Sequence, residues 1–425
     1  MFYGLYYIIY TVFLLVSTVF CRYIIKREKI FPKTKIYPEG EEMKKLSALF
    51  LVICCVVLSA APRMQKKLQL PEILYAVPGI ECNLYFENIF LTINPANFAF
   101  EVKCTKGRCD EKRWRFTPKA DETGSYDLKV RVFDDDGVVA EGGTKLVVTP
   151  VDAGKGKKIT MLLIGSSNIA RQHAFPLHLH SLFQLPGNPA VTMIGENGPG
   201  APDKLKAVRH EGYGGWSYQT FTTSGRKRIK GRGSNYRENP FWNFKSSSLD
   251  FPGYFKKNSS GIAPDFVIIS LGGNDTFAAD DTTIDKFLTD ISKRINLFLD
   301  ALRKAAPHTR IGLNLMEYCS KSQDAFGKSY GTLQSRWQTR KNLFKYRQMV
   351  TDLVKSRNDK NLFTIPIYTA IDNENNVIRQ KEFANARNKT RVLRDANGLH
   401  PLPAGYQQTA DCAYGWLKYL LNQSK

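Results

Sequence analysis

Four short segments of the sequence carry residue types that can perform acyl transfer. Ser167 follows an aliphatic run that ends at Gly165, and Asn274 follows another run that ends in a Gly-Gly pair. Gly215 lies in a Gly-Gly-Trp segment, and His400 stands near the C-terminus. A serine hydroxyl becomes a nucleophile when a base such as histidine takes its proton, and amide N–H groups stabilise the oxyanion that then forms. Residues of these types could therefore cleave an ester.

Each segment also has a simpler interpretation. Serines after a strand commonly cap a helix, Gly-Gly-Asn-Asp is a common turn composition, and a histidine beside a proline is usually a surface residue. The order and placement of the four segments are more specific. Together they resemble the SGNH hydrolases, also called the GDSL family, whose four blocks carry a serine, a glycine, an asparagine and a histidine in that order. The resemblance covers residues 159–422.

This resemblance implies a role for each residue. The Gly-Asp-Ser block of the family corresponds to Gly-Ser-Ser here, which makes Ser167 the nucleophile, and the Leu-His-Pro block makes His400 the base. The oxyanion hole would consist of the backbone N–H groups of Ser167 and Gly215 and the side-chain amide of Asn274. Without a side chain, Gly215 could bring its N–H close to the substrate. No metal and no cofactor are expected.

Two positions depart from the family pattern. The aspartate of the first block is Ser166 here, which leaves the nucleophile in place. The family also has an aspartate three residues before the histidine, where this sequence has Asn397, and asparagine cannot carry the charge that stabilises an imidazolium ion. We expect an active enzyme in which Asn397, Asp395 or a backbone carbonyl, the last leaving a Ser-His dyad, orients the ring of His400. The alternative is an inactive site.

The elements that would position these residues alternate between aliphatic runs and helical segments. The runs read ITMLLIG, AVTMIGENG, DFVIISLGGND, RIGLNLME and LFTIPIY. Between the third and the fourth, apolar residues from Ile284 to Leu302 have helical spacing, and Pro307 ends this helix. Such alternation predicts a parallel sheet with helices on both faces and functional residues at the carboxyl ends of its strands. We expect a three-layer α/β/α, flavodoxin-like sandwich over residues 153–425.

A small β-sandwich domain is expected to precede it, over residues 63–152. The clearest strands flank the turn composition of residues 134–137, Asp-Asp-Asp-Gly. Tyr126, early in a strand after a glycine-containing turn, gives this region a resemblance to immunoglobulin-like domains. Residues 151–158 have the Gly and Lys content of a linker between the two domains.

The N-terminus contains two apolar segments. The first twenty residues are about long enough to span a bilayer. The second follows Met43 and has a basic start, a short apolar body and small residues up to Ala61, which is the layout of a signal peptide. We expect Met43 to be the true start, residues 1–62 to be an extension plus signal peptide, and the protein to be secreted or periplasmic. A membrane anchor formed by residues 1–21 is the alternative.

The charge of the chain is high, and its cysteines are few. The net charge of +22 remains about +18 without residues 1–62, which hold eight Lys and Arg and four Asp and Glu. The basic stretch over residues 224–237 is either a solvated insertion or a patch that gathers an acidic glycan. Nucleic acid is not expected as a partner, because no binding motif is present. One disulfide among Cys82, Cys104 and Cys109 would fit an oxidising compartment.

Two further groups of residues have both a functional and a structural interpretation. Three histidines are spaced like metal ligands but lack flanking acidic residues, so we expect them to lie in a buried or rim-lining segment: His173, His178 and His180. Four aromatic residues could stack on sugar rings or belong to the core: Trp216, Phe241, Trp242 and Trp337.

The sequence thus predicts a serine esterase that removes acyl groups, above all acetyl, from a carbohydrate, which could be an anionic glycan. A catalytically impaired glycan-binding protein on the same scaffold is an alternative, motivated by Asn397. A lipid or thioester hydrolase is a third interpretation. The sequence after residue 160 shows no long apolar lid, which disfavours it.

Overall fold

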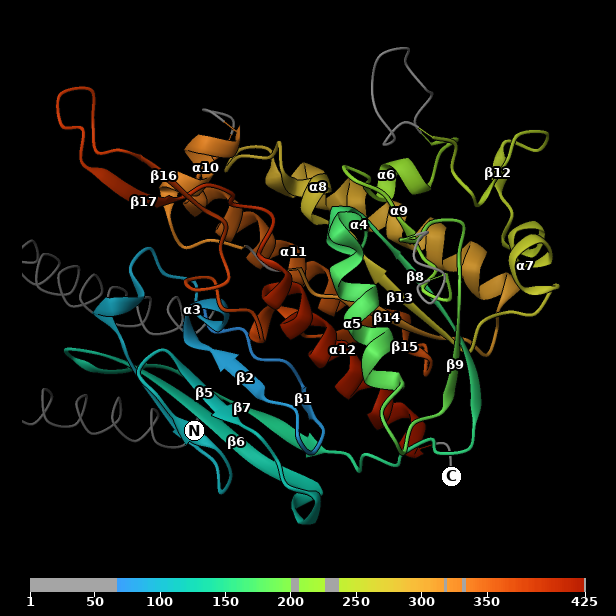
Figure 1. Cartoon of the computed structure of the whole chain (residues 1–425), viewed down its shortest axis with the longest axis horizontal. Coiled ribbons are helices and arrows are strands. Elements are labelled where there is room, and N and C mark those ends of the chain that lie inside the picture. The colour runs from blue at the N-terminus through green and yellow to red at the C-terminus, as the bar shows by residue number, and fades with distance from the viewer. Residues whose placement is uncertain (1–66, 200–205, 226–236, 317–318, 331–333, 424–425) are drawn as a thin grey trace, which may run out of the picture. The chain divides into compact units, whose positions relative to one another are not determined.

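The aliphatic runs form one parallel sheet in the computed structural model, which describes residues 67–199, 206–225, 237–316, 319–330 and 334–423. Its strands are β8 (Lys158–Gly165), β9 (Ala190–Ile194), β10 (Glu211–Gly212), β13 (Phe266–Ser270), β14 (Arg310–Asn314) and β15 (Leu362–Ile365). Their order is β10–β8–β13–β14–β15. β9 and β10 lie on the same edge of β8: β9 pairs with residues 158–162 of β8, and β10 pairs with residues 164 and 165. All these pairings are parallel, so the flavodoxin-like sheet is confirmed (Figure 1).

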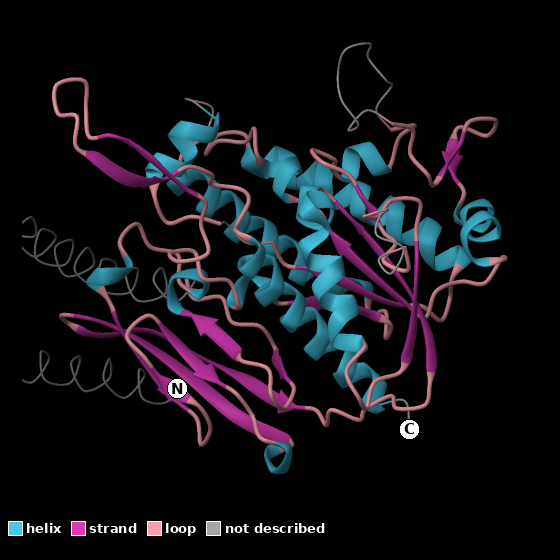
Figure 2. Ribbon diagram, viewed as in Figure 1, coloured by secondary structure: helices cyan, strands magenta, loops and turns pink. Residues whose placement is uncertain are grey.

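Helices cover both faces of this sheet. They are α5 (Ala174–Phe183), α9 (Ile284–Ala305), α11 (Arg336–Arg357) and α12 (Pro403–Gln423). Met161 and Leu163 of β8 belong to the apolar cluster that includes α5 and α12, whereas Leu162 and Ile164 belong to the cluster that includes α9 and α11. Alternate strand residues point to opposite faces. The predicted three-layer arrangement is therefore confirmed (Figure 2).

The helix predicted between the third and fourth runs is α9. Its residues Ile291, Ile295, Phe298 and Leu302 are all buried, as their helical spacing requires. The helix ends at Ala305, shortly before Pro307. A proline cannot continue the hydrogen-bond pattern of a helix, which explains why the predicted and observed ends agree.

The region before residue 153 contains two sheets. One has the order β1 (Ile73–Ala76), β7 (Gly137–Val148), β6 (Gly124–Asp134) and β3 (Ala99–Lys103), and the other has β2 (Cys82–Tyr85), β5 (Arg113–Phe116) and β4 (Arg108–Cys109). The pairings are antiparallel except that of β1 with β7, which is parallel. An N-terminal β region therefore precedes the α/β fold, as predicted.

Two local features of this region follow from its sequence. β6 and β7 form a hairpin whose turn is the Asp-Asp-Asp-Gly segment, with Asp134 paired to Gly137. The hydroxyl of Tyr126, near the start of β6, donates a hydrogen bond to the carbonyl of Glu122, 3.0 Å away. A tyrosine that bonds back to the chain just upstream is a feature of immunoglobulin-like sandwiches.

Buried arginines of α11 join the β region to the α/β region. Arg340 donates to the carbonyls of Thr92 and Glu87, each at 2.7 Å, and Arg347 donates to the side-chain oxygen of Gln69 at 2.7 Å. Both arginines are only 3% exposed. A buried guanidinium is stable only when its donors are satisfied, so these contacts fix the two regions together.

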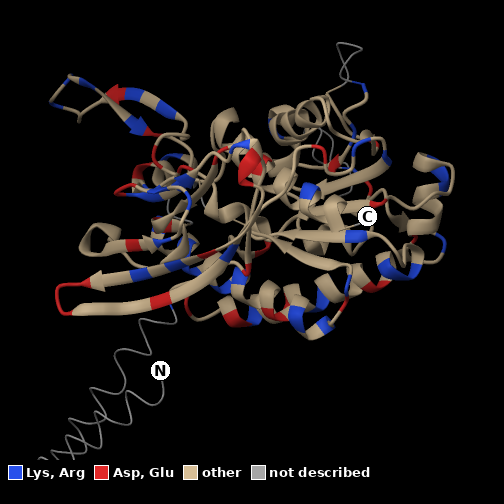
Figure 3. Ribbon diagram, turned by 90° about the horizontal axis from the view of Figure 1, so that it is seen from below, with Lys and Arg blue, Asp and Glu red and all other residues tan. Residues whose placement is uncertain are grey.

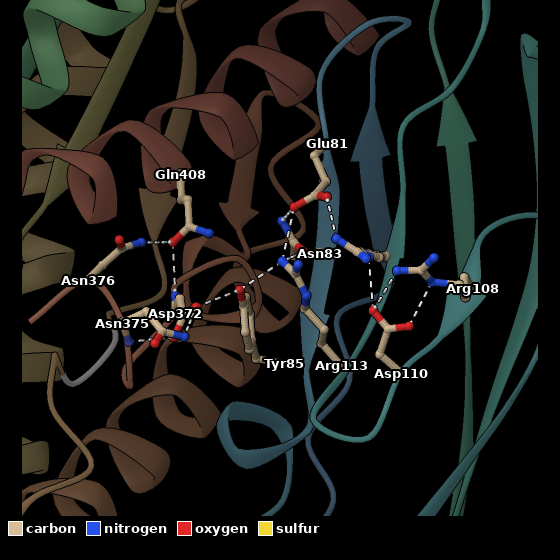
Figure 4. A network of polar contacts seen from close by, with 11 residues as sticks. Glu81, Asn83, Tyr85, Arg108, Asp110, Arg113, Asp372, Asn375, Asn376 and Gln408 are labelled. Carbon is tan, nitrogen blue, oxygen red and sulfur yellow. Dashed lines mark hydrogen bonds and ion pairs between the residues drawn. The ribbon is translucent and has the colours of Figure 1, made fainter.

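A second polar network connects the same two regions (Figure 4). The hydroxyl of Tyr85 on β2 donates to the carboxylate of Asp372 at 3.2 Å, and Arg113 on β5 donates to that hydroxyl at 2.9 Å. The backbone N–H of Asp372 donates to Gln408 of α12 at 2.9 Å. Residues 63–425 accordingly form one compact unit, and the predicted domain boundary at residues 152 and 153 stays a prediction.

The remaining elements are short. The helices are α3 (Phe86–Ile89), α4 (Ser167–Ala170), α6 (Tyr218–Phe221), α7 (Phe251–Ser259), α8 (Gly273–Thr276) and α10 (Gln323–Tyr330). The strands are β11 (Trp242–Asn243), β12 (Ser248–Leu249), β16 (Arg379–Phe383) and β17 (Arg391–Asp395). Single 3-10 turns occupy Pro95–Asn97, Ala120–Glu122, Arg171–His173 and Ile367–Thr369.

Several predictions fall on parts of the chain that the structure does not describe. The extension, the signal peptide and the anchor of residues 1–62 lie outside the described residues, as does most of the basic stretch over residues 224–237. Among the helices that are described, none combines the length and the apolarity of a membrane span. Cys82, Cys104 and Cys109 are free thiols, so the local disulfide does not form here.

Candidate active site

The four sequence segments meet at the carboxyl ends of the parallel strands. Ser167 is the first residue of α4, directly after β8, and Asn274 lies in α8, directly after β13. Gly215 follows β10, and His400 precedes α12. One pocket is lined by Ser167, Asn274 and His400 together, whereas Gly215 does not line it. Residues 233 positions apart in the chain thus share one site.

Ser167 and His400 are in direct contact. The Oγ atom of Ser167 lies 2.8 Å from the Nε2 atom of His400. This distance is within the range required for proton transfer between a nucleophile and its base. The arrangement can abstract the hydroxyl proton if Nε2 is the unprotonated nitrogen of the ring.

The turn between β8 and α4 fixes the position of Ser167. A Cβ at Gly165 would overlap with the side chain of Ile169 and would lie 3.0 Å from the carbonyl of Ser270. The backbone N–H of Ser166 donates to that same carbonyl at 3.3 Å. Only a glycine therefore permits the chain to turn this tightly out of the sheet and to present Ser167 at its edge.

Asn274 connects the glycine segment to the segment that follows β13. Its side-chain N–H donates to the carbonyl of Trp216 at 2.8 Å, and Trp216 directly follows Gly215. The amide group carries a second N–H, and the residue lines the pocket beside Ser167. The side-chain amide of Asn274 is held in this way by a bond to the neighbouring loop.

Asp275, next to Asn274, is a buried carboxyl group that the sequence analysis did not single out. It accepts the backbone N–H of Tyr218 at 2.9 Å, and the backbone N–H groups of Gln219 and Gly272 contribute as well. Burial is the main influence on this group and raises the pKa of Asp275 to about 7. The residue ties α6 to α8 and so holds the wall of the site.

Gly272 meets a steric requirement in the same segment. It has a φ of +110°, and a Cβ there would overlap with the ring of Tyr346 on α11. The hydroxyl of Tyr346 donates to the carbonyl of Leu271 at 3.0 Å. The first glycine of the Gly-Gly pair is thus needed for packing, while Asn274 supplies the donor.

Glu211 joins the glycine segment to α7 and to the segment after β9. Its carboxylate accepts the hydroxyls of Tyr213 and Tyr254, the latter at 2.7 Å, and the backbone N–H of Glu196 at 2.7 Å. Burial raises the pKa of Glu211 to about 7. The lone signal in the sequence is an acidic residue directly before the Gly-Tyr-Gly-Gly run, and its partners are too distant in the chain to be inferred.

The two residues expected to orient His400 make other contacts. The side-chain oxygen of Asn397 accepts the backbone N–H groups of Leu399 and His400, at 3.0 and 2.9 Å. Asp395 accepts the hydroxyl of Ser320 at 2.8 Å and pairs with Arg379 at 3.1 Å. Among the described residues, neither side chain bonds to the ring, so Asn397 orders the turn that carries His400 rather than the imidazole.

Within the part of the chain that the structure describes, His400 therefore stands beside the serine with no carboxylate on its ring. Burial, with a smaller contribution from the charge of Arg171, lowers the pKa of His400 to about 4. The ring is neutral at pH 7 and can accept a proton. Arg171 lies in the turn after α4 and was not recognised in the sequence as part of this site.

The pocket beside Ser167 combines apolar and amide side chains. Phe277, Met316, Leu343 and Leu399 provide apolar walls, and Asn342 donates to the backbone of α8 and of the segment after it. The side-chain N–H of Gln334, another lining residue, donates to the carbonyl of Phe277 at 2.6 Å. The walls are thus fixed by hydrogen bonds from α11 and from the residues before it.

The other predicted histidines and aromatic residues lie outside this pocket. Nδ1 of His173 lies 2.8 Å from Nε2 of His210, and His178 pairs with Asp411 of α12 at 2.8 Å. No group of three or more His, Cys, Asp or Glu residues in the described parts of the chain could hold a metal ion. Trp216 and Phe241 are fully buried, so the core interpretation applies to both.

Comparisons with known proteins agree with this geometry in outline. The profile of the GDSL-like lipase/acylhydrolase family matches residues 197–408, a segment that contains Gly215, Asn274 and His400 and begins after Ser167. A search of curated proteins finds no match.

Solved structures with a similar fold include two family 3 carbohydrate esterases. The one from Clostridium thermocellum is 16% identical, with a TM-score of 0.39, and the match covers 63% of this chain and 99% of that one. The one from Talaromyces cellulolyticus is 14% identical, with a TM-score of 0.36 and coverage of 62% and 99%. A carbohydrate acetylesterase family member from Sinorhizobium meliloti is 12% identical, with a TM-score of 0.36 and the same coverage. From the family match and the four segments that meet at one strand edge, we conclude that this chain belongs to the GDSL-like lipase/acylhydrolase family.

Proposed function

We propose that this protein is a serine esterase that removes acyl groups, above all acetyl, from a carbohydrate. The observation that carries the proposal is the contact of 2.8 Å between Oγ of Ser167 and Nε2 of His400, in a pocket that Asn274 also lines. A nucleophile, a base and an amide donor around one small space are the groups that acyl transfer requires.

The first half of the reaction transfers the acyl group to the enzyme. His400 takes the hydroxyl proton of Ser167 at Nε2 while the serine oxygen forms a bond to the acyl carbon. The resulting oxyanion accepts hydrogen bonds from the side-chain amide of Asn274 and from the backbone N–H groups of Ser167 and Gly215. The carbon–oxygen bond to the sugar then breaks, and His400 returns its proton to the departing sugar oxygen.

The second half releases the acid. A water molecule loses a proton to His400 and attacks the acyl carbon of the serine ester. The bond between the acyl carbon and the serine oxygen breaks, the proton passes back to that oxygen, and the carboxylic acid departs. The step regenerates Ser167 and the neutral ring of His400.

The lining of the pocket favours a short acyl group. Phe277, Met316 and Leu343 lie beside Ser167, and Asn342 and Gln334 anchor this wall to neighbouring backbone. A methyl group fits such a space, whereas a long lipid chain needs an extended apolar channel. The choice of a carbohydrate follows from the resemblance of the four segments to SGNH hydrolases together with the signal-like segment after Met43.

The missing acid on His400 has a consequence for the rate. Among the described residues, no carboxylate on Nδ1 stabilises the imidazolium that forms in the transition state, because Asp395 binds Ser320 and Arg379, and Asn397 binds backbone N–H groups. A lower turnover than that of a full Ser-His-Asp triad is expected. The ring is unprotonated at neutral pH, because burial lowers its pKa to about 4, but a pKa this low also makes it a weaker base.

Hydrolysis of p-nitrophenyl acetate tests the proposal. We expect Ser167→Ala to reduce kcat at least about a thousandfold, as loss of the nucleophile does in other serine hydrolases. Ser181→Ala, which removes an exposed hydroxyl on α5, serves as the matched control and should behave as the unaltered protein. Equal rates for the unaltered protein and Ser167→Ala would refute the esterase.

Comparison of acetyl with octanoyl esters tests the acyl class. The small pocket predicts that the acetyl ester is the better substrate, measured as kcat/KM for the two p-nitrophenyl esters. A preference for octanoyl would favour the lipid or thioester hydrolase instead.

A catalytically impaired glycan-binding protein is the second candidate. It is favoured by the absence of a carboxylate on the His400 ring among the described residues. Glycan binding that is unchanged in Ser167→Ala, combined with no ester turnover in the unaltered protein, would select it.

We also propose that the protein is secreted or periplasmic, which rests on the signal-like segment after Met43. Fractionation of cells that express the whole chain, with N-terminal sequencing of the mature protein, tests this. A mature N-terminus near residue 62 in the exported fraction would support it, and an uncleaved chain in the cytosol would contradict it.

A further inference from the structure

A basic hairpin projects from the body of the molecule close to the chain segment that carries His400. It consists of β16 and β17, which are antiparallel with Lys381 opposite Leu393 and Phe383 opposite Arg391. Figure 1 shows it extending beside α10, and Figure 3 shows basic segments along it. β17 ends at Asp395, five residues before His400.

The two faces of this hairpin differ. On one face, Arg394 pairs with Asp324 of α10 at 3.1 Å and Glu382 lies 3.8 Å from Lys328, so this face packs on the body. The other face carries Arg379, Lys381, Phe383, Arg391 and Leu393, which alternate with the first set. We call these five residues the hairpin face.

The hairpin face exposes apolar surface to solvent. Phe383 is 47% exposed and Leu393 is 62% exposed. The two side chains lie on the same face of a protruding strand pair, so together they form a small apolar surface that is open to a partner. The loop of residues 384–390 contains no large apolar side chain, and insertion of such a tip into a bilayer would not be favourable.

Cations surround this apolar surface and lack acidic partners. Lys389 and Arg391 lie 5.0 and 5.1 Å from the centre of the Phe383 ring. Within the described ranges, Lys381, Arg387, Lys389 and Arg391 form no ion pair with a carboxylate, whereas Arg379 is paired with Asp395. An anionic partner would supply the missing counter-charges along the strand direction.

A further cation stands beside the candidate active site. Arg171, on the turn after Ser167, is close enough to influence His400 electrostatically. Its backbone N–H donates to the carbonyl of Ser167, but within the described residues its guanidinium group makes neither a hydrogen bond nor an ion pair. A chain that carries repeated negative charges could therefore contact the hairpin and approach Ser167 at the same time.

We propose that the hairpin face binds a stretch of an anionic polysaccharide, a polymer of uronic acid residues, and presents its acylated sugars to Ser167. Carboxylates of the polymer pair with Lys381 and Arg391, and a sugar ring packs on Phe383 and Leu393. A polyuronate fits better than a membrane, because the exposed apolar residues Phe383 and Leu393 lie on the strands, and the basic tip loop offers no large apolar side chain for insertion into a bilayer. This inference rests on the esterase proposed above and names its substrate class.

Binding of polygalacturonate to the full-length Ser167→Ala protein tests the hairpin directly, because no turnover alters the polymer. Titration calorimetry at 0.15 M salt compares this protein with a form that also carries Lys381→Ala and Arg391→Ala. We expect about tenfold weaker binding from the loss of two close charge pairs. Phe383→Ala should weaken binding about threefold with little change in salt dependence, since it removes a stacking contact.

A matched control removes two exposed cations elsewhere. Lys286→Ala with Lys293→Ala on α9 changes the net charge by the same amount, and we expect binding to weaken less than twofold by simple long-range attraction. An equal loss in both double variants would overturn the proposal, because binding would then depend only on net charge. Tighter, hairpin-dependent binding to vesicles with anionic lipid or to single-stranded DNA would overturn it in favour of those partners.

An activity measurement separates this inference from the esterase itself. On partially acetylated polygalacturonate, we expect the hairpin double variant to lower the ratio of kcat/KM for the polymer to that for p-nitrophenyl acetate about tenfold. An unchanged ratio contradicts the hairpin role while the esterase stands. Hairpin-dependent binding in a protein that hydrolyses neither ester contradicts the esterase while the binding surface stands.

Discussion

The serine side and the histidine side of the candidate site are built differently. Ser167 is held by a tight turn in which Gly165 packs against Ile169 and the carbonyl of Ser270, and the side chain of Asn274, the proposed oxyanion donor, is bonded to the carbonyl of Trp216. His400 is held through its backbone by Asn397, and its ring has no carboxylate partner among the described residues. The comparison shows that both sides fix positions, but only the serine side also supplies groups that stabilise charge.

The largest effect is expected from removal of the proposed base, His400, which tests its partnership with Ser167. We expect His400→Ala to lower kcat on p-nitrophenyl acetate by at least about a thousandfold, because the serine proton then has no acceptor. The double variant with Ser167→Ala should be no slower than either single variant, since the two residues act as one unit. Additive losses would show that they do not.

Removal of the oxyanion donor should have the next largest effect. Asn274→Ala is expected to reduce kcat about a hundredfold with a smaller change in KM, because the hydrogen bond forms mainly in the transition state. The same substitution breaks the contact with Trp216, so thermal unfolding must be measured alongside the kinetics. A kcat within threefold of the unaltered protein at equal stability would remove Asn274 from the oxyanion hole.

The rigidity of the two sides can be compared by adding one methyl group to each. Gly165→Ala places a Cβ against Ile169 and the carbonyl of Ser270, and we expect a loss of about 2–3 kcal/mol in the free energy of unfolding. The three atoms nearest to a Cβ in Gly398→Ala all belong to the ring of Phe326, at 2.8 Å, and none is backbone, so a smaller loss of about 1–2 kcal/mol is expected. Denaturant unfolding measures both, and a larger loss for Gly398→Ala would reverse the comparison.

A charge restored on the histidine side should have the smallest effect on rate. An unprotonated ring is needed, so kcat/KM should rise as the pH passes upward through the pKa of His400, which burial lowers to about 4. A carboxylate in Asn397→Asp favours the charged ring and so raises the pKa of His400. We expect the rise of kcat/KM with pH to move to higher pH, and kcat at pH 7 to increase about tenfold.

Asn397→Ala is the control for that variant. It removes the acceptor for the N–H groups of Leu399 and His400 without adding charge. We expect kcat/KM still to rise with pH near pH 4, and the free energy of unfolding to fall by about 1 kcal/mol. If kcat/KM of Asn397→Asp rises at the same pH as that of the unaltered protein, a charge at position 397 does not interact with the ring of His400.

Much of the α/β fold was predictable, because its signals are local. Alternating aliphatic runs gave the parallel sheet, and the spacing from Ile284 to Leu302 gave α9. Long-range partners were not predictable. Arg340 and Arg347 reach carbonyls and an amide some 250 to 280 residues away, and nothing near them in the sequence marks these contacts.

The candidate site was predictable in its members but not in its support. Strand ends and the resemblance of the residue order to the SGNH pattern pointed to Ser167, Gly215, Asn274 and His400. Ser167, Asn274 and His400 line one pocket in the structure, and Gly215 does not. The carboxyls of Glu211 and Asp275 acquire their role through burial and through donors from other segments. Asn397 and Asp395 have other partners than expected. The side chain of Asn397 accepts backbone N–H groups, and that of Asp395 binds Ser320 and Arg379.

Trapping the acyl-enzyme tests the central claim most directly. Protein mixed with p-nitrophenyl acetate, quenched in acid within the first turnover and digested, can be examined by mass spectrometry for acetylated peptides. We expect one acetyl group on the hydroxyl of Ser167, absent from Ser167→Ala and accumulating more slowly in His400→Ala. An acetyl group on a different residue, or hydrolysis with no adduct at Ser167, would contradict the acyl transfer described here.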